Sequence, residues 1–413
     1  MFGCFGNFTG CTTVTVYNGF TDTVSVSISE QSISVPPFRA LQLRLPPGKK
    51  QMVSTRINNR LVETFAAKTS AGFGKYVYNV GQAMPLVEWT QVYGNASERP
   101  DRLLGTPRWF STSAEVLFKD PPKSVESKNG GATRLVLSAL DKLTPDTLLS
   151  YIKKESEQQA LIRRHVIWDA PQSAFLAFWI GLATDTDIVA LLKERLSHYP
   201  YDIASLLIII HEYAPDRAAY DAICAEYTAL AEQQPDNSNV HYISICCMNN
   251  EEQKDLAFIQ GKKQWPRNAW FHFAAGYTYI EQGNWLDADR AFTSAINLHD
   301  GFKETLAITL LRLKRLQGNA SKSIQHKLSK NSHTLSRLLR LESGEELGNT
   351  PYRFYSLLNK GDIAAAFTAA QEMKNGQERC IRLLAASEDA PAEIVNEAVQ
   401  LDSTQGIDQS TVW

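Results

Sequence analysis

The stretch AWFHFAAGYTYIEQGNWLDADRAFTSAINLHDGF, residues 269–302, decides the fold of the larger part of this chain. Apolar and small residues recur at helical spacing on both sides of Gly283, which predicts two antiparallel helices joined by a tight turn. Gly276 and Ala288 stand where the two helices must approach closely, and Phe292 fills the space beside them. The stretch therefore predicts a helical hairpin built on a small-residue contact.

Helix-breaking residues recur at a regular interval around this stretch. Pro200, Pro235 and Pro266 lie 35 and 31 residues apart, and Asp300 follows 34 residues later. Such a period is typical of helical-repeat arrays, in which neighbouring units share one continuous core. The hairpin resembles a tetratricopeptide repeat (TPR) at six positions: Gly276, Tyr279, Gly283, Ala288, Phe292 and Ala295. The resemblance implies an α-helical scaffold with a concave groove for a protein or peptide.

A weaker version of the same pattern covers roughly residues 170–400. Apolar residues at helical spacing, with a proline just beyond residues 188–199 and 220–234, predict further helices on both sides of the hairpin. The expected helices cover residues 188–199, 201–213, 220–234, 239–250 and 361–373. Another kind of α-solenoid is the alternative to a TPR-like array.

The first third of the chain follows a period of two. Between Thr12 and Phe118 apolar and polar residues alternate in runs such as TVTVYNG, QMVSTRI and KYVYNV, separated by Asn-Gly, Pro-Pro and Asn-Asn pairs. Seven or eight short strands without intervening helices predict an antiparallel sandwich or barrel of an immunoglobulin-like or transthyretin-like class.

The predicted fold class is multidomain α+β, with an N-terminal antiparallel β-sandwich followed by an all-α TPR-like superhelix. Asp120-Pro121-Pro122 begins a stretch rich in turn residues that is typical of a domain boundary. Beyond it we expect helices over Leu135–Leu143 and Pro145–Ile167. The predicted limits are 1–11 leader, 12–119 immunoglobulin-like β-sandwich, 120–134 linker, 135–401 helical domain and 402–413 tail.

Charge and cysteine usage exclude several function classes. The chain has 42 basic and 44 acidic residues and a net charge of −2, which does not favour nucleic-acid binding. No stretch approaches the roughly 20 apolar residues of a membrane span. Cys224, Cys246, Cys247 and Cys380 show no CxxC spacing, and we expect them to pack as small apolar residues rather than bind metal.

Catalytic signatures are absent from the sequence. There is no GxSxG, HExxH or phosphate-binding glycine loop, and His211-Glu212 lacks the second histidine of a metalloprotease because Pro215 stands there. We therefore predict a protein that is not an enzyme and uses no cofactor or metal.

Two groups of residues are candidates for partner binding. Trp270, Phe273 and Tyr277, continued by Ile280, form an aromatic stripe on the first helix of the hairpin, at positions that the resemblance places on the groove. The alternative is a core shared with neighbouring helices.

Between residues 303 and 340 lies a basic run, opposed only by Glu304, in which Arg312 and Arg315 are predicted to bind an acidic segment or surface. The alternative for this run is a solvated face.

The sequence predicts a non-enzymatic adaptor that presents a TPR-like groove to a protein or peptide. The alternative is a structural cell-envelope component that is the soluble part of a larger, membrane-anchored bacterial protein, because the leader MFGCFGNFTGC precedes the β-rich part. A third reading is an enzyme with an unrecognised site. We expect a cytoplasmic or envelope-associated domain without a signal peptide, whose oligomeric state the sequence leaves open.

Overall fold

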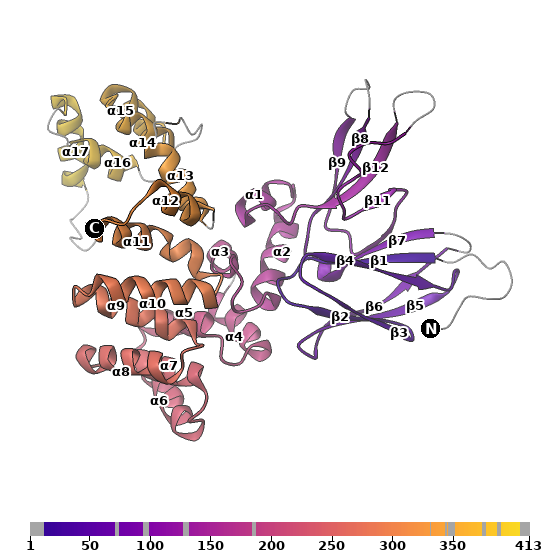
Figure 1. Ribbon diagram of the computed structural model, residues 1–413, viewed down its shortest axis with the longest axis horizontal. Coiled ribbons are helices and arrows are strands. Elements are labelled where there is room, and N and C mark those ends of the chain that lie inside the picture. The colour runs from indigo at the N-terminus through magenta and orange to yellow at the C-terminus, as the bar shows by residue number, and fades with distance from the viewer. Residues whose placement is uncertain are drawn as a thin grey trace. The chain divides into compact units, whose positions relative to one another are not determined.

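A computed structural model describes residues 12–70, 74–93, 99–126, 132–183, 187–330, 332–342, 345, 352–373, 377–385 and 390–404. The chain is α+β, with β-sheets at its N-terminal end followed by helices (Figure 1). It divides into two compact units, Met1–Gly301 and Phe302–Trp413. The expected leader and most of the expected tail lie outside the described residues.

The N-terminal part contains three four-stranded sheets, in the orders β10-β7-β1-β4, β3-β2-β5-β6 and β11-β12-β8-β9. Most of each quoted run, TVTVYNG, QMVSTRI and KYVYNV, lies in a strand, but eleven strands, rather than the seven or eight expected, are described between residues 12 and 118. The strands are β1 Thr12–Asn18, β2 Val24–Ile28, β3 Gln31–Val35, β4 Arg39–Leu45, β5 Lys50–Ile57, β6 Arg60–Lys68, β7 Gly74–Asn79, β8 Leu86–Val92, β9 Arg99–Gly105, β10 Trp109–Ser111, β11 Val116–Leu117 and β12 Thr133–Ala139.

The first two sheets share one hydrophobic core. Val14 and Val16 of β1 and Val24 and Val26 of β2 are fully buried in it, because every second residue of each strand points inward. Most pairings are antiparallel, as expected. The pairs β1 with β7 and β11 with β12 are parallel, which the purely antiparallel prediction did not include.

The helix expected over Leu135–Leu143 is wrong, because residues 133–139 form strand β12. β12 pairs antiparallel with β8, with Val136 opposite Trp89. The run Leu135-Val136-Leu137 fits a helix or a buried strand equally well, and the available partner strand decides between them. The end of the expected linker and the start of the expected helical domain therefore belong to a sheet, and the remaining domain limits stay a prediction.

The first unit continues with ten helices among the residues that the structure describes. They include all the helices expected between residues 188 and 250. The helices are α1 Pro145–Ser150, α2 Glu155–Trp168, α3 Leu176–Leu182, α4 Ile188–His198, α5 Ile203–Tyr213, α6 Arg217–Gln233, α7 Ser238–Cys246, α8 Glu251–Gln264, α9 Ala269–Glu281 and α10 Trp285–Leu298.

One expected helix, Pro145–Ile167, is two helices in the structure. Thr144 is the N-cap residue of α1 and Pro145 occupies its first turn, as predicted. The helix ends at Ser150, and the chain leaves the helical conformation before α2 begins at Glu155. The apolar spacing across residues 151–154 did not show this break.

Helices α9 and α10 form the predicted hairpin. A Cβ atom added to Gly276 would lie 2.4 Å from Cε1 of Phe292, so the glycine is what allows the two helices this close an approach. Gly283 closes the turn with φ +70°. Asn284 then caps α10 by accepting a hydrogen bond from the backbone N–H of Asp287 at 3.3 Å.

The sheets and the first helices of this unit are joined by a common core and a buried histidine. The His165 ring on α2 is stacked against Trp179 of α3, with 4.4 Å between ring centroids. Its Nδ1 lies 3.0 Å from Asp169 Oδ2, and its Nε2 lies 2.7 Å from the carbonyl oxygen of Ala83 in the β-rich part. These contacts tie α2 to the sheets.

The second unit is helical in the residues that are described. Its helices include residues 363–371, within the range 361–373 expected from the sequence. Phe354, Ala366, Ile381 and Ile394 meet in one of its cores. The helices are α11 Phe302–Leu316, α12 Lys322–Ser329, α13 His333–Glu342, α14 Tyr352–Asn359, α15 Ile363–Gln371, α16 Gln377–Ala385 and α17 Ala392–Thr404.

The expectation that all four helical cysteines pack as small apolar residues is wrong for two of them. A disulfide joins Cys224 of α6 to Cys247, which follows the last residue of α7, across 23 positions of sequence. Cys246 and Cys380 take no part in a disulfide. The pairing depends on how α6 packs on α7, and cysteine spacing alone does not define it.

Candidate functional site

The aromatic stripe begins where α9 is capped. The Oδ1 atom of Asn268 accepts a hydrogen bond from the backbone N–H of Trp270 at 3.0 Å, which fixes the first turn of the helix. From there Trp270, Phe273 and Tyr277 follow at intervals of three and four residues, so they lie along one side of α9.

The three rings form one continuous series of contacts. Ring centroids lie 6.0 Å apart for Trp270 and Phe273, and 5.1 Å apart for Phe273 and Tyr277. The stripe also packs inward, because Trp270 lies 5.7 Å from the Tyr242 ring of α7 and Tyr277 lies 5.0 Å from the Phe292 ring of α10. Trp270 and Phe273 are half-buried, whereas Tyr277 is 39% exposed. The stripe is thus part of the core at one end and part of the surface at the other.

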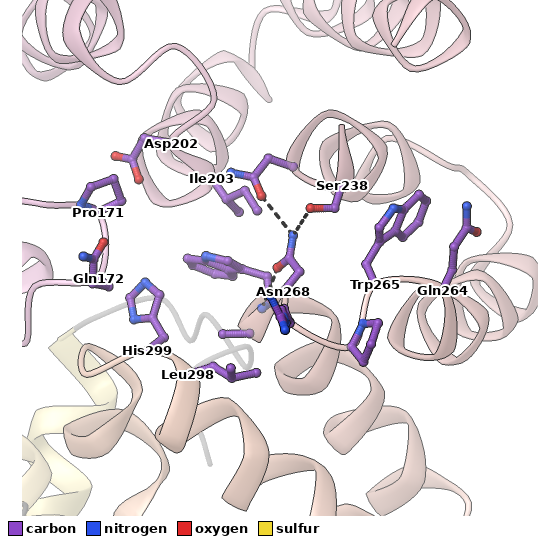
Figure 2. A pocket seen from close by; sticks show the side chains of 15 residues that line it. Pro171, Gln172, Asp202, Ile203, Ser238, Gln264, Trp265, Asn268, Leu298 and His299 are labelled. Carbon is purple, nitrogen blue, oxygen red and sulfur yellow. Dashed lines mark hydrogen bonds between the residues drawn. The ribbon is translucent and has the colours of Figure 1, made fainter. Parts of the chain in front are cut away.

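A cavity of about 600 Å³ lies beside Trp270 at the ends of successive helices (Figure 2). Its walls come from the residues after α2, the starts of α5 and α7, the connection between α8 and α9, and the end of α10. Apolar rings and side-chain amides alternate around it. Residues that line it include Gln172, Ile203, Trp265, Asn268, Trp270 and His299.

Hydrogen bonds between asparagines connect the repeats at this cavity. The Asn268 side-chain amide donates to Ser238 Oγ and to Asn239 Oδ1, each at 2.9 Å. Figure 2 draws the bond between Asn268 and Ser238 as a dashed line. Asn239 in turn donates to the carbonyl oxygen of Tyr201 at 2.8 Å. The start of α9 is thereby fixed to the start of α7, and the start of α7 to the residues before α5.

The charged side chains at the cavity differ in whether an opposite charge already compensates them. Asp202 Oδ2 accepts hydrogen bonds at 2.6 Å from Nε of the fully buried Arg195 and from Oγ of Ser205, so its charge is compensated. Arg267 is exposed at the cavity wall. A ligand at this cavity therefore meets Arg267 as an accessible cation and Asp202 as a carboxylate that is already paired.

His299 adds a titratable group to the same cavity. Burial lowers the pKa of His299, while the carboxylates of Asp202 and Asp300 act in the opposite direction. Because the net shift is downward, the ring is mainly neutral at pH 7. Its Nδ1 already accepts a hydrogen bond from the backbone N–H of Gly301 at 3.1 Å.

The predicted basic residues lie in the second unit. Arg312 and Arg315 are both exposed on α11, while Leu306, Leu310 and Leu313 of the same helix are buried, so the helix has an apolar and a polar face over these residues. Leu316 at the end of the helix is 64% exposed. The structure brings together Trp270, Phe273 and Tyr277, and it describes the two arginines in a separate unit.

Within the described residues, no group of three or more histidine, cysteine, aspartate or glutamate side chains could hold a metal ion. None of the helices described is both long and apolar enough to cross a membrane.

Sequence reasoning missed several residues of the cavity, namely Trp265, Asn268 and His299. A signal for the asparagines existed, since Pro235-Asp236-Asn237 and Pro266-Arg267-Asn268 repeat a Pro-x-Asn pattern before α7 and α9. In both cases the asparagine is the N-cap of the following helix. The cavity itself arises from the packing of helices that are distant in sequence, so no local pattern predicted it.

Comparison with known proteins gives structural likeness only. No family model matches the chain, and no curated protein matches it. Yeast Tom70 is similar with 14% sequence identity and a TM-score of 0.29, over 63% of this chain and 59% of that chain. A chain of the APC/C hetero-tetramer Cut9-Hcn1 is similar with 16% identity and a TM-score of 0.30, over 64% of this chain and 58% of that chain.

This chain thus spans less than two thirds of the length of either similar structure. Likeness with TM-scores of this size adds nothing to what the helix packing already shows. The helical-repeat character of residues 188–298 rests on the helix pairs, the Gly276 contact and the asparagine bonds between repeats.

Proposed function

We propose that this protein is a non-enzymatic scaffold that binds a protein or peptide partner on its helical-repeat face. The observation that carries the proposal is the aromatic stripe of α9, which begins with the half-buried Trp270 at the wall of a cavity of about 600 Å³ and continues to the exposed Tyr277. Tryptophan and tyrosine are enriched among the residues that supply most of the binding energy in protein interfaces.

The cavity fits a peptide better than it fits an apolar ligand. Gln172 and the exposed Arg267 line it next to the Trp265 indole ring, so a backbone amide and a side chain of a partner could be bound together. The aromatic rings contribute contact area, and their packing against Tyr242 and Phe292 holds them in place before a partner arrives.

The exposed arginines of α11 are proposed as a second contact. Arg312 and Arg315 lie on a helix whose apolar residues face its own core, so their guanidinium groups are presented by a rigid element. Guanidinium groups bind carboxylate groups through two parallel hydrogen bonds. An acidic segment of the partner is therefore the kind of sequence that they would bind.

The proposal is tested with a displayed peptide library selected on the wild-type protein, followed by calorimetry of one selected peptide. Tyr277→Ala should weaken its binding about 5-fold or more, since an interface aromatic contributes more than about 1 kcal/mol. Tyr151→Ala is the matched control, because Tyr151 is also 39% exposed but lies at the end of α1. Circular dichroism checks that both variants keep their helices.

Equal binding by wild type and Tyr277→Ala would contradict the proposed role of the stripe.

Arg312→Gln with Arg315→Gln tests the second contact, and it should reduce both the affinity for acidic peptides and the dependence of that affinity on salt. The cell-envelope alternative gains no support from the residues described.

A further inference from the structure

A half-buried arginine at the junction of the sheets and α2 has no carboxylate partner. Arg164 of α2 donates from Nη1 to the carbonyl oxygen of Gln82 and from Nη2 to Oε1 of Gln82, both at 3.3 Å. Both acceptors are neutral and both bonds are long. Within the described residues, no aspartate or glutamate oxygen lies within 4.0 Å of this guanidinium. A partly buried charge without a counter-charge is unfavourable unless a ligand supplies one.

The nearest carboxylate is already occupied. Glu63 of β6 accepts hydrogen bonds from the Tyr78 hydroxyl at 2.8 Å and from the Gly81 backbone N–H at 2.6 Å. It also pairs with Arg108 at 3.5 Å. Two guanidinium groups, Arg108 and Arg164, therefore share the influence of one carboxylate, and the cluster carries an excess of positive charge.

The electrostatic environment of Arg164 agrees with this geometry. Burial lowers the pKa of Arg164, the Glu63 carboxylate raises it, and the Arg108 guanidinium lowers it again. The net direction is downward. The charged form of Arg164 is thus less well compensated in the folded protein than in water, and an added negative charge would stabilise it.

A cavity of about 330 Å³ opens at this arginine. It is lined by residues 104–107 at the end of β9, by Gln82, and by Ser156, Glu157 and Ala160 on α2. Gln82 is fixed in place, because its Nε2 donates to the carbonyl oxygen of Thr106 at 2.9 Å. The walls are thus mainly polar, and they come from both the sheets and the helix.

The one acidic residue of the cavity wall does not neutralise Arg164. Glu157 pairs with Lys154 at 2.9 Å. It precedes Arg164 by seven positions on α2, which corresponds to about 10 Å along the helix axis. The cavity therefore has a compensated carboxylate at one end and an uncompensated guanidinium at the other.

We propose that this cavity binds a small oxyanion, a carboxylate or phosphate group, through the guanidinium of Arg164. The planar guanidinium offers two parallel N–H donors that match two oxygens of either group. The Ser156 hydroxyl on the same helix is a further donor at the wall. A bound anion would contact residues of both α2 and the β-rich part, so it would also stabilise the junction between them.

Isothermal titration calorimetry tests this with two probes, inorganic phosphate and acetate, on the full chain at constant ionic strength. We expect saturable binding of at least one probe to the wild type. Binding of phosphate alone identifies a phosphate site, and binding of acetate alone identifies a carboxylate site. Lack of saturable binding by both would overturn the proposal.

The variants assign the binding to Arg164. Arg164→Gln should lower the affinity about 10- to 100-fold, which is the effect expected for losing a hydrogen bond to a charged group. Arg163→Gln is the matched control, because Arg163 is the preceding residue of α2, is half exposed and pairs with Glu194. It should bind the probe like the wild type, and unchanged affinity of Arg164→Gln would overturn the assignment.

Arg164→Lys keeps the test decisive if Arg164→Gln does not fold. Lysine retains the positive charge but not the paired donors, so the affinity should fall about 10-fold while the circular dichroism spectrum stays unchanged. Affinity equal to that of the wild type in this variant would show that charge alone, and not the guanidinium fork, binds the anion, and it would overturn that part of the proposal.

Discussion

The replacement Gly276→Ala tests the helix contact on which the hairpin depends. The added Cβ would lie 2.4, 2.6 and 2.8 Å from three ring atoms of Phe292, which is closer than real Cβ atoms come to other atoms. Phe292 is fully buried, so its ring has little room to move away. Overpacking of this kind costs about 1–3 kcal/mol, and alanine recovers about 1 kcal/mol through its higher helix propensity. We expect the free energy of unfolding to fall by up to about 2 kcal/mol.

The matched control is Gly181→Ala on α3. Gly181 is also helical, but a Cβ atom there would meet nothing within 4 Å. That variant should be more stable than the wild type by about 1 kcal/mol, because only the propensity changes. Urea unfolding followed by far-ultraviolet circular dichroism measures both variants. If Gly276→Ala were as stable as Gly181→Ala, the close contact with Phe292 would be refuted.

The double variant Gly276→Ala with Phe292→Leu separates the clash from other effects. Leucine is smaller than phenylalanine and leaves space for the new methyl group. The two substitutions should therefore couple favourably by about 1 kcal/mol in a double-mutant cycle. Strict additivity would show that the two side chains do not meet.

Three further predictions concern stability. Reducing the disulfide, or replacing Cys224 by Ser, should cost about 3 kcal/mol, the loop-closure entropy for a separation of 23 residues, as measured by urea unfolding with and without reductant. The free energy of unfolding should fall as pH is lowered through 6.5, because folding lowers the pKa of His299 and the unfolded chain therefore binds more protons than the folded chain. His299→Gln should make the melting temperature depend less on pH in this range. Asp202→Asn should cost about 3–5 kcal/mol in urea unfolding, because it leaves the buried Arg195 unpaired, whereas an exposed pair would give under about 1 kcal/mol.

The helical hairpins could be predicted because their determinants are local. Gly276, Gly283 and the prolines between repeats act within a few residues of their own position, and the helices they predicted are present. Residues 135–139 show the limit of this reasoning. Their run of apolar residues suits a buried strand as well as a helix, and the choice depends on β8, which lies more than 40 residues away.

The cavities and the disulfide depend on contacts between distant residues, and for that reason the sequence did not predict them. Trp265 and His299 meet at one cavity because α8 and α10 end on the same side of the array. Arg164 meets Gln82 across 82 positions. The aromatic stripe was correctly placed on one side of α9, and its role in partner binding stays a prediction.

The free thiol of Cys246 has a consequence for how long the disulfide pairing persists. It directly precedes Cys247, so it is the thiol best placed to attack the bond and exchange partners. Burial raises the pKa of Cys246 to about 12, so only about one molecule in 10⁵ carries the reactive thiolate at pH 7. Exchange between the adjacent cysteines is correspondingly slow. The link between α6 and α7 is therefore protected kinetically against scrambling by its own neighbour.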